Sequence, residues 1–270
     1  MYKRQPLGYL ILSLSRKFSL TVFRYNIPLP LDEIIYVSLD ILAVLFLVYL
    51  YDKYVLKIHW QDIYVCKPVP QVKWVVAAVL LSTFVLVCCI FLTKGTFIKE
   101  EISIQEKIDL AFNTILGGGV RAAVTEEVIF RGLIFSSLQK MKGTKFAVAG
   151  SSILFAVMHL VNIDTFNVYN VISLLIAIFL IGCAFALIVL ETGSIWSGVV
   201  FHGLYNVISG DMDILHVSAA ESFPAIWLYK PVKEYRWITG IIGSDDIETG
   251  LPAMIGFVIV IIVASVSYTH

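Results

Sequence analysis

Two adjacent glutamates and an arginine, Glu126, Glu127 and Arg131, lie in a stretch of sequence that is otherwise apolar. An ionisable side chain at bilayer depth costs about 2.5 kcal/mol or more, so it usually faces a protein interior or a wet cavity and serves pairing, transport or chemistry. Two histidines, His159 and His202, lie in equally apolar segments further along the chain. These three segments of chemistry-bearing residues together form a candidate active site.

The spacing of the two glutamates assigns them different roles. Residues four apart on a helix share a face, whereas neighbours diverge by about 100°. Glu127 and Arg131 therefore face each other, in the order that favours an ion pair. Glu126 points elsewhere and is the candidate general base or acid. The alternative is that both glutamates only hold helices together, in a buried polar network with Arg131 and Arg121.

His202 and Asn206 are also four residues apart and present an imidazole and a carboxamide to the same neighbour. Both groups can donate hydrogen bonds, as the stabilisation of an oxyanion on a substrate carbonyl requires. The alternative is a pair of polar residues that only joins helices. His159 ends the apolar run that begins at Phe155. The sequence therefore predicts that His159 and His202 converge on Glu126 from two other helices.

The composition indicates an integral membrane protein. Hydrophobic residues make up 59% of the chain and charged residues 15%, against about 45–50% and about 25% in soluble proteins. The formal net charge is zero, so nothing points to a nucleic-acid partner. The four cysteines lack metal-type spacing and are expected to be small core residues. We expect one membrane domain over residues 1–270, with the lipid bilayer as its surroundings.

A helix needs about 20 apolar residues to cross about 30 Å of hydrocarbon. The clearest candidate spans are roughly 34–51, 74–93, 168–190 and 252–268. Three shorter candidates carry the chemistry: 108–138, with a break expected near Gly117–Gly119, 146–161 and 195–209. Residues 7–25 form either an eighth span or an interfacial helix. The predicted fold class is thus an all-α, polytopic transmembrane helical bundle of seven to eight spans with an intramembrane active site.

Three further expectations concern the connections and one buried acid. The lysine-bearing loops 52–73 and 139–145 fall on one side in this layout, which the positive-inside rule assigns to the cytoplasm. The charged and aromatic stretch 210–250 is expected to lie on the membrane surface and to cap the bundle. Asp40, within the first clear span, is expected to serve helix packing.

Three motifs in this order resemble one family of intramembrane proteases. They are Glu-Glu-x-x-x-Arg at 126–131, Phe-x-x-x-His at 155–159 and His-x-x-x-Asn at 202–206, separated by hydrophobic spans. The set is similar to that of the CAAX protease and bacteriocin-processing family (CPBP, also called Abi). The resemblance covers roughly residues 108–209.

The resemblance implies an intramembrane endopeptidase in the cell membrane that cleaves a membrane-associated peptide or protein. Glu126 and His159 would activate a water, and His202 and Asn206 would hold the oxyanion. Glu127 and Arg131 would orient the site. The family is often labelled metalloprotease, and Glu126, His159 and His202 could supply three ligands to a zinc ion. The preferred alternative is general-base catalysis by glutamate and histidine without a metal or other cofactor. The family further suggests bacteriocin processing or self-immunity. A non-catalytic immunity or bacteriocin-binding membrane protein is the competing hypothesis.

Overall fold

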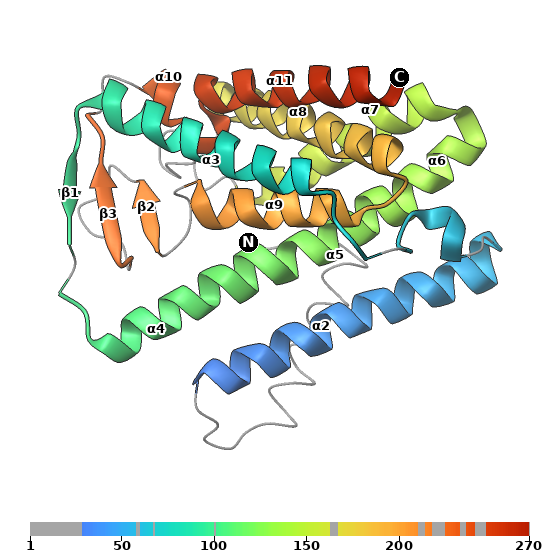
Figure 1. Cartoon of the computed structure of the whole chain (residues 1–270), viewed down its shortest axis with the longest axis horizontal. Helices are drawn as coiled ribbons and strands as arrows, with labels where there is room; N and C mark the ends of the chain where they lie inside the picture. The colour runs from blue at the N-terminus through green and yellow to red at the C-terminus, as the bar shows by residue number, and fades with distance from the viewer. Residues whose placement is uncertain are drawn as a thin grey trace.

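The structure is a computed structural model that describes residues 29–57, 60–66, 68–99, 101–162, 167–209, 214–217, 225–232, 236–240 and 247–269. Helices dominate these residues and pack into a bundle with a small sheet at one end (Figure 1). The fold is thus an all-α bundle of membrane type. The predicted segment 7–25 lies outside the described residues.

Four helices in the described part of the chain are long and apolar enough to cross a membrane, by length and composition. They coincide with the four clearest predicted spans: α2 (Leu29–Tyr51, extended by a π-helical turn to Leu56), α3 (Val72–Thr93), α8 (Val168–Thr192) and α11 (Leu251–Thr269). These helices expose large apolar side chains, such as Phe91 at 77% and Leu80 at 65%. Such surfaces match a lipid environment better than water.

The shorter predicted spans also fall on helices. The glutamates lie on one continuous helical rod that comprises α4 (Ile104–Phe112), a π-helical stretch (Asn113–Ala122), α5 (Ala123–Glu127), a second π-helical stretch (Val128–Ile134) and α6 (Phe135–Lys142). The expected break at Gly117–Gly119 is wrong, because the helix widens into π geometry there and continues. The two histidines lie on α7 (Thr144–His159) and α9 (Trp196–Ile208).

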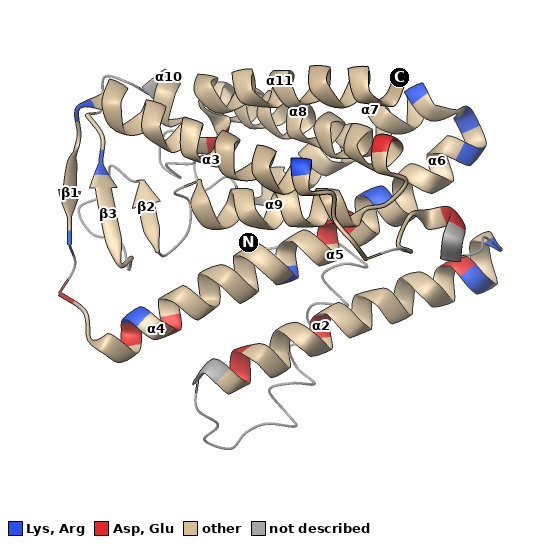
Figure 2. Ribbon diagram, in the orientation of Figure 1, with Lys and Arg blue, Asp and Glu red and all other residues tan. Residues whose placement is uncertain are grey.

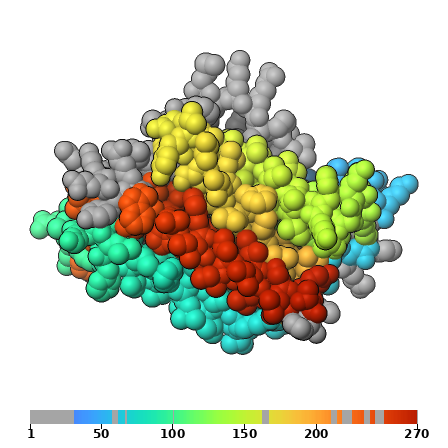
Figure 3. All heavy atoms as spheres, turned by 90° about the horizontal axis from the view of Figure 1, so that it is seen from above, coloured from blue at the N-terminus to red at the C-terminus, as the bar shows by residue number. Residues whose placement is uncertain are grey.

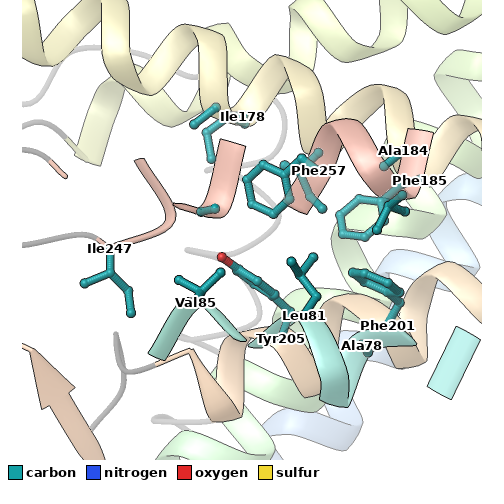
Figure 4. Packing of buried hydrophobic residues seen from close by; sticks show 14 of the residues in the cluster. Ala78, Leu81, Val85, Ile178, Ala184, Phe185, Phe201, Tyr205, Ile247 and Phe257 are labelled. Carbon is teal, nitrogen blue, oxygen red and sulfur yellow. The ribbon is translucent and has the colours of Figure 1, made fainter. Parts of the chain in front are cut away.

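The core lies where α8, α9 and α11 meet α3. Figure 4 shows Phe185 of α8 and Phe257 of α11 on one side of Phe201 and Tyr205 of α9. The rings of Phe185 and Phe201 are 5.9 Å apart, and those of Tyr205 and Phe257 are 5.5 Å apart. Burying each such side chain contributes about 1.5–3 kcal/mol. On the outside, α11 lies between α3 and α8 (Figure 3).

A buried ion pair attaches α2 to the glutamate-bearing rod. The Asp40 carboxylate has no exposed surface, and its Oδ2 lies 3.6 Å from Nη1 of Arg121. The Arg121 guanidinium also lies 5.8 Å from the centre of the Tyr36 ring. Asp40 therefore packs helices together, as expected. Among the described residues, Arg121 pairs with Asp40, whereas Arg131 pairs with Glu127.

The two ends of the bundle differ. Lysines gather around the α6–α7 turn (Figure 2), where Lys140 binds Asp62 at 2.9 Å and so joins the two predicted lysine-bearing loops. At the other end, β1 (Thr96–Ile98), β3 (Trp227–Lys230) and β2 (Leu215–Val217) form a sheet in the order β1-β3-β2. β3 is antiparallel to β1 and parallel to β2. The sequence predicted only a surface loop for residues 210–250, and so missed two of these strands.

Candidate active site

The glutamates lie where the rod changes its helical geometry. α5 is a single α-helical turn between the two π-helical stretches. Isolated π-helical turns are rare and frequently mark functional sites, because the wider backbone redirects side chains and leaves carbonyls available to other partners. Both glutamates lie on α5, where neighbouring side chains diverge by about 100°. Glu127 is fully buried, whereas the Glu126 side chain is 32% exposed.

Glu127 and Arg131 form the predicted ion pair. Arg131 Nη1 lies 3.2 Å from Glu127 Oε1, and neither side chain has exposed surface. Arg131 Nη2 donates to the backbone carbonyl of Gly182 on α8 at 3.2 Å. The guanidinium lies 4.1 Å from the centre of the Phe155 ring and 5.1 Å from that of Phe185. Two aromatic faces and a carbonyl thus hold the arginine, and the arginine neutralises Glu127.

His202 bridges the two glutamates. Its Nδ1 lies 3.2 Å from Glu127 Oε1, within hydrogen-bonding distance, and its Nε2 lies 3.9 Å from Glu126 Oε2. The imidazole stacks on the Phe185 ring, with centroids 5.0 Å apart and an interplanar angle of 21°. An ionised carboxylate only accepts hydrogen bonds, so the contact with Glu127 indicates that Nδ1 carries the proton of a neutral His202. Neutral His202 then presents an unprotonated Nε2 to Glu126.

His159 reaches Glu126 from the end of α7. Its Nδ1 lies 2.8 Å from the backbone carbonyl of Phe155, and its Nε2 lies 4.0 Å from Glu126 Oε2. The Phe155 ring meets the imidazole edge-on at 4.6 Å. A carbonyl accepts and never donates, so this contact likewise assigns the proton of neutral His159 to Nδ1. Both imidazoles therefore direct a basic nitrogen at the same carboxylate oxygen.

A close crossing of two glycines brings α9 against the glutamate-bearing rod. A Cβ on Gly203 would lie 2.5 Å from the Gly119 carbonyl oxygen, and a Cβ on Gly119 would lie 2.7 Å from a Val207 methyl group. One turn along α9, Asn206 Nδ2 donates to the Gly118 carbonyl at 3.0 Å. Glycine at both positions permits the backbone contact that sets the depth of His202 against Glu126.

The converging side chains surround a cavity of about 180 Å³. Its polar lining comprises Glu126, His159, His202, Tyr205, Asn206 and Glu248. Its apolar lining comprises Ala122, Phe155, Ile178, Ile181 and Phe185. The cavity is therefore a small polar site enclosed by apolar walls, as ligand and catalytic sites generally are.

The structure thus brings together all six predicted site residues, with roles that the geometry alone does not assign. Sequence reasoning missed Phe185, Gly203 and Glu248. Phe185 and Gly203 are ordinary residues of apolar helices, and no spacing rule marks them. Glu248 could have been noticed as an acidic residue four positions before the last span, but charge alone does not separate it from its acidic neighbours in that loop.

The three candidate zinc ligands do not fit a tetrahedral zinc ion as they are placed. With metal–ligand bonds of about 2.0–2.2 Å, tetrahedral donors lie about 3.4 Å apart, whereas Glu126 Oε2 lies 4.0 Å and 3.9 Å from the two histidine nitrogens. The described residues contain no group of three or more His, Cys, Asp or Glu side chains arranged to hold a metal ion.

Comparison with known proteins identifies a family that matches the segment around the site. Residues 108–208 match the Rce1-like family model, which is described as type II CAAX prenyl endopeptidase Rce1-like. This segment contains all six predicted site residues. Neither the curated proteins nor the solved structures contain a match to this chain. The match confirms the resemblance predicted from the three motifs.

Proposed function

We propose that the protein is an intramembrane endopeptidase that cleaves a membrane-associated peptide or protein. Residues 108–208 support this proposal because they match the CPBP family. One observation carries this proposal. The Nε2 atoms of His159 and His202, from two different helices, lie 4.0 and 3.9 Å from the same oxygen of Glu126 at the edge of a cavity. Merely structural polar residues would be expected to bond each other directly.

The proposed nucleophile is a water held by Glu126 and His159. Their 4.0 Å separation exceeds a hydrogen bond but suits a bridging water about 2.8 Å from each atom. An unprotonated Nε2 and a carboxylate repel each other unless a shared proton lies between them, and a water supplies that proton. Deprotonation of this water by Glu126 or His159 would generate the hydroxide that attacks the peptide carbonyl.

The proposed oxyanion site consists of His202 and Asn206. His202 donates from Nε2 only when it is protonated at both nitrogens, and its Nδ1 then donates to Glu127 Oε1. One N–H of the Asn206 amide already bonds Gly118, which leaves the second N–H to donate toward the cavity. Glu127 and Arg131 then act as positioning residues, because they fix the ring of His202 rather than contact the substrate.

The remaining features of the proposal concern the membrane. We infer a single domain over residues 1–270 in the cell membrane, with seven or eight spans and the cavity at bilayer depth. The lysine-bearing end would face the cytoplasm. Processing of bacteriocins or self-immunity is the biological role that the family suggests for such a peptidase. A non-catalytic immunity protein is the competing proposal, and it requires no reaction at Glu126.

Reconstitution in lipid tests the two proposals against each other. Wild-type protein and the Glu126→Ala, His159→Ala and His202→Ala variants are incubated with candidate peptides, and the products are identified by mass spectrometry. Cleavage by the wild type and its loss in each variant supports the peptidase. Equal cleavage by wild type and Glu126→Ala, or protection of cells that survives all three substitutions, contradicts it. Metal analysis and chelation of the active protein separate the zinc scheme from the metal-free scheme.

A further inference from the structure

The sheet carries aromatic side chains that are only partly buried. Its pairing places Phe97 of β1 opposite Tyr229 of β3, and the two rings lie 4.9 Å apart. Trp227, two residues before Tyr229, lies on the same face because strand side chains alternate. Phe97 is 53% exposed and Trp227 43% exposed, whereas Tyr229 is buried. The Lys99 ammonium lies 5.8 Å from the centre of the Trp227 ring. The exposed aromatic face of the sheet is therefore defined by Phe97, Trp227 and Lys99.

Tyr229 holds the sheet against the end of α3. Its hydroxyl accepts a hydrogen bond from the Gly95 N–H at 2.7 Å and donates to the Ile90 carbonyl at 2.9 Å. The Thr93 hydroxyl lies 3.0 Å from the same oxygen. Gly95 lies so close to the Lys230 carbonyl that no side chain would fit there. The sheet is therefore attached directly to the end of α3.

The end of α3 marks the expected boundary of the hydrocarbon. α3 is one of the helices in the described part of the chain that are long and apolar enough to cross a membrane. Its 22 residues span about 33 Å at 1.5 Å per residue, close to the hydrocarbon thickness of about 30 Å. The strands run across the end of α3 rather than onward from it (Figure 1). The exposed aromatic face therefore lies at the level where hydrocarbon gives way to lipid headgroups.

The side chains of this face match that level of a bilayer. Tryptophan is enriched at membrane–water interfaces because its ring is apolar and its N–H is polar. A lysine can keep its apolar stem beside the hydrocarbon and extend its ammonium to the headgroups. Apolar surface leads up to the face, because the last turn of α3 exposes Phe91 at 77% and Leu92 at 46%. The face therefore continues a surface that already suits lipid.

We propose that the exposed aromatic face binds the headgroup region of the bilayer, with Phe97 and Trp227 inserted among the lipids and Lys99 directed at their phosphates. This contact would fix the depth of α3 in the membrane. α3 packs on α9, where the rings of Trp74 and Phe201 lie 6.4 Å apart. The depth of α9, and with it that of the cavity, would then follow from the sheet. The inference depends on the membrane location of the protein and on no catalytic activity.

Fluorescence quenching tests this inference on the full-length protein in phosphatidylcholine bilayers. The lipids carry bromine on the acyl chains either near the headgroup or near the chain end, and acrylamide quenches from the water. The chain has five tryptophans, so the signal of Trp227 is the difference between the wild type and Trp227→Phe. In the Trp227→Phe background, Phe97→Trp provides a second probe of the face. In the same background, Leu80→Trp provides a depth control, because Leu80 is 65% exposed in the middle of α3. Circular dichroism verifies that each variant is folded.

Bromine near the headgroup should quench Trp227 and the Phe97→Trp probe at least twofold more strongly than bromine near the chain end. The Leu80→Trp probe should show the reverse order. Quenching of the face by acrylamide alone, as in the unfolded protein, would place it in water and overturn the inference. Strongest quenching by chain-end bromine would also overturn it, as would protection from every quencher, which would show that a second copy or another protein covers the face.

The depth control separates this inference from the membrane assignment. If no brominated lipid quenches Leu80→Trp, the membrane location itself is wrong, and the inference fails with it. If Leu80→Trp is quenched as expected and the face is not, only the inference fails. Neither result depends on peptide cleavage, so the peptidase proposal is tested separately.

Discussion

The glycine crossing between α9 and the glutamate-bearing rod provides a quantitative prediction. In Gly203→Ala the new Cβ would lie 2.5 Å from the Gly119 carbonyl oxygen, whereas ordinary contact begins at 3.4 Å. The helices must therefore separate by about 0.9 Å if the clash is relieved along this direction. The bond from Asn206 to Gly118, now 3.0 Å, would then lengthen beyond hydrogen-bonding distance. A displacement of about 1 Å in a catalytic site can reduce the rate about 100-fold.

The assay for this prediction is kcat/KM for peptide cleavage together with the free energy of unfolding in mixed micelles. Alanine gains about 1 kcal/mol over glycine within a helix, but overpacking costs about 1–3 kcal/mol, so Gly203→Ala should be neutral to destabilising and about 100-fold less active. Gly150→Ala is the matched control, because its new Cβ would lie 3.0 Å from the flexible end of Leu138 and in ordinary contact, at 3.7 Å, with the Phe146 ring. A Gly203→Ala protein that is more stable and fully active would refute this reasoning.

Other substitutions test three sets of contacts: one in the site, one at the start of α4 and one at the end of α3. Arg131→Met should destabilise the fold by about 3–5 kcal/mol because it leaves Glu127 buried and unpaired. Adding Glu127→Leu should restore most of that stability without restoring activity. A double variant that is as unstable as the single variant would contradict this explanation. Hydrogen bonds from the side chain and backbone of Ser103 lower the pKa of the Glu106 carboxyl group. The ionised carboxylate therefore stabilises the start of α4 at pH values above the pKa of Glu106 in the unfolded chain. This contribution is lost as the pH falls through the pKa of Glu106 in the folded protein. Protection factors of the α4 amides, which correct for the intrinsic pH dependence of exchange, should therefore fall at acid pH in the wild type and depend less on pH in Ser103→Ala. Tyr229→Phe removes a hydroxyl that bonds three groups at the end of α3, and chemical unfolding should show a loss of about 1–3 kcal/mol.

The sequence predicted the elements of the site better than the elements around it. Long apolar runs mark helices because a membrane demands them, so four helices match the clear spans. The i,i+4 rule identified the contact between Glu127 and Arg131, which is observed at 3.2 Å. That rule depends only on local geometry. The same reasoning applied to three separate segments predicted that two histidines meet Glu126, although it could not give their distances.

What the sequence did not reveal depends on long-range contacts. Gly117–Gly119 suggested a helix break, since glycine weakens helices, but contact with α9 keeps the helix continuous and π-helical. The sheet pairs β1 with β3 across more than 120 residues, and short strands of this kind carry no periodic signal. Phe185 and Glu248 gain significance only because α8 and the turn before α11 approach the cavity in space.

The central claim is that Glu126 activates a water in a site completed by two histidines. Its most direct test is the rate of peptide cleavage by Glu126→Gln in lipid, because glutamine keeps the size of the side chain and removes its basicity. Loss of general-base catalysis typically costs about 100- to 10,000-fold. We predict a loss of this size, with folding and peptide binding retained and with Glu101→Gln as active as the wild type. Cleavage by Glu126→Gln at the wild-type rate would contradict the account.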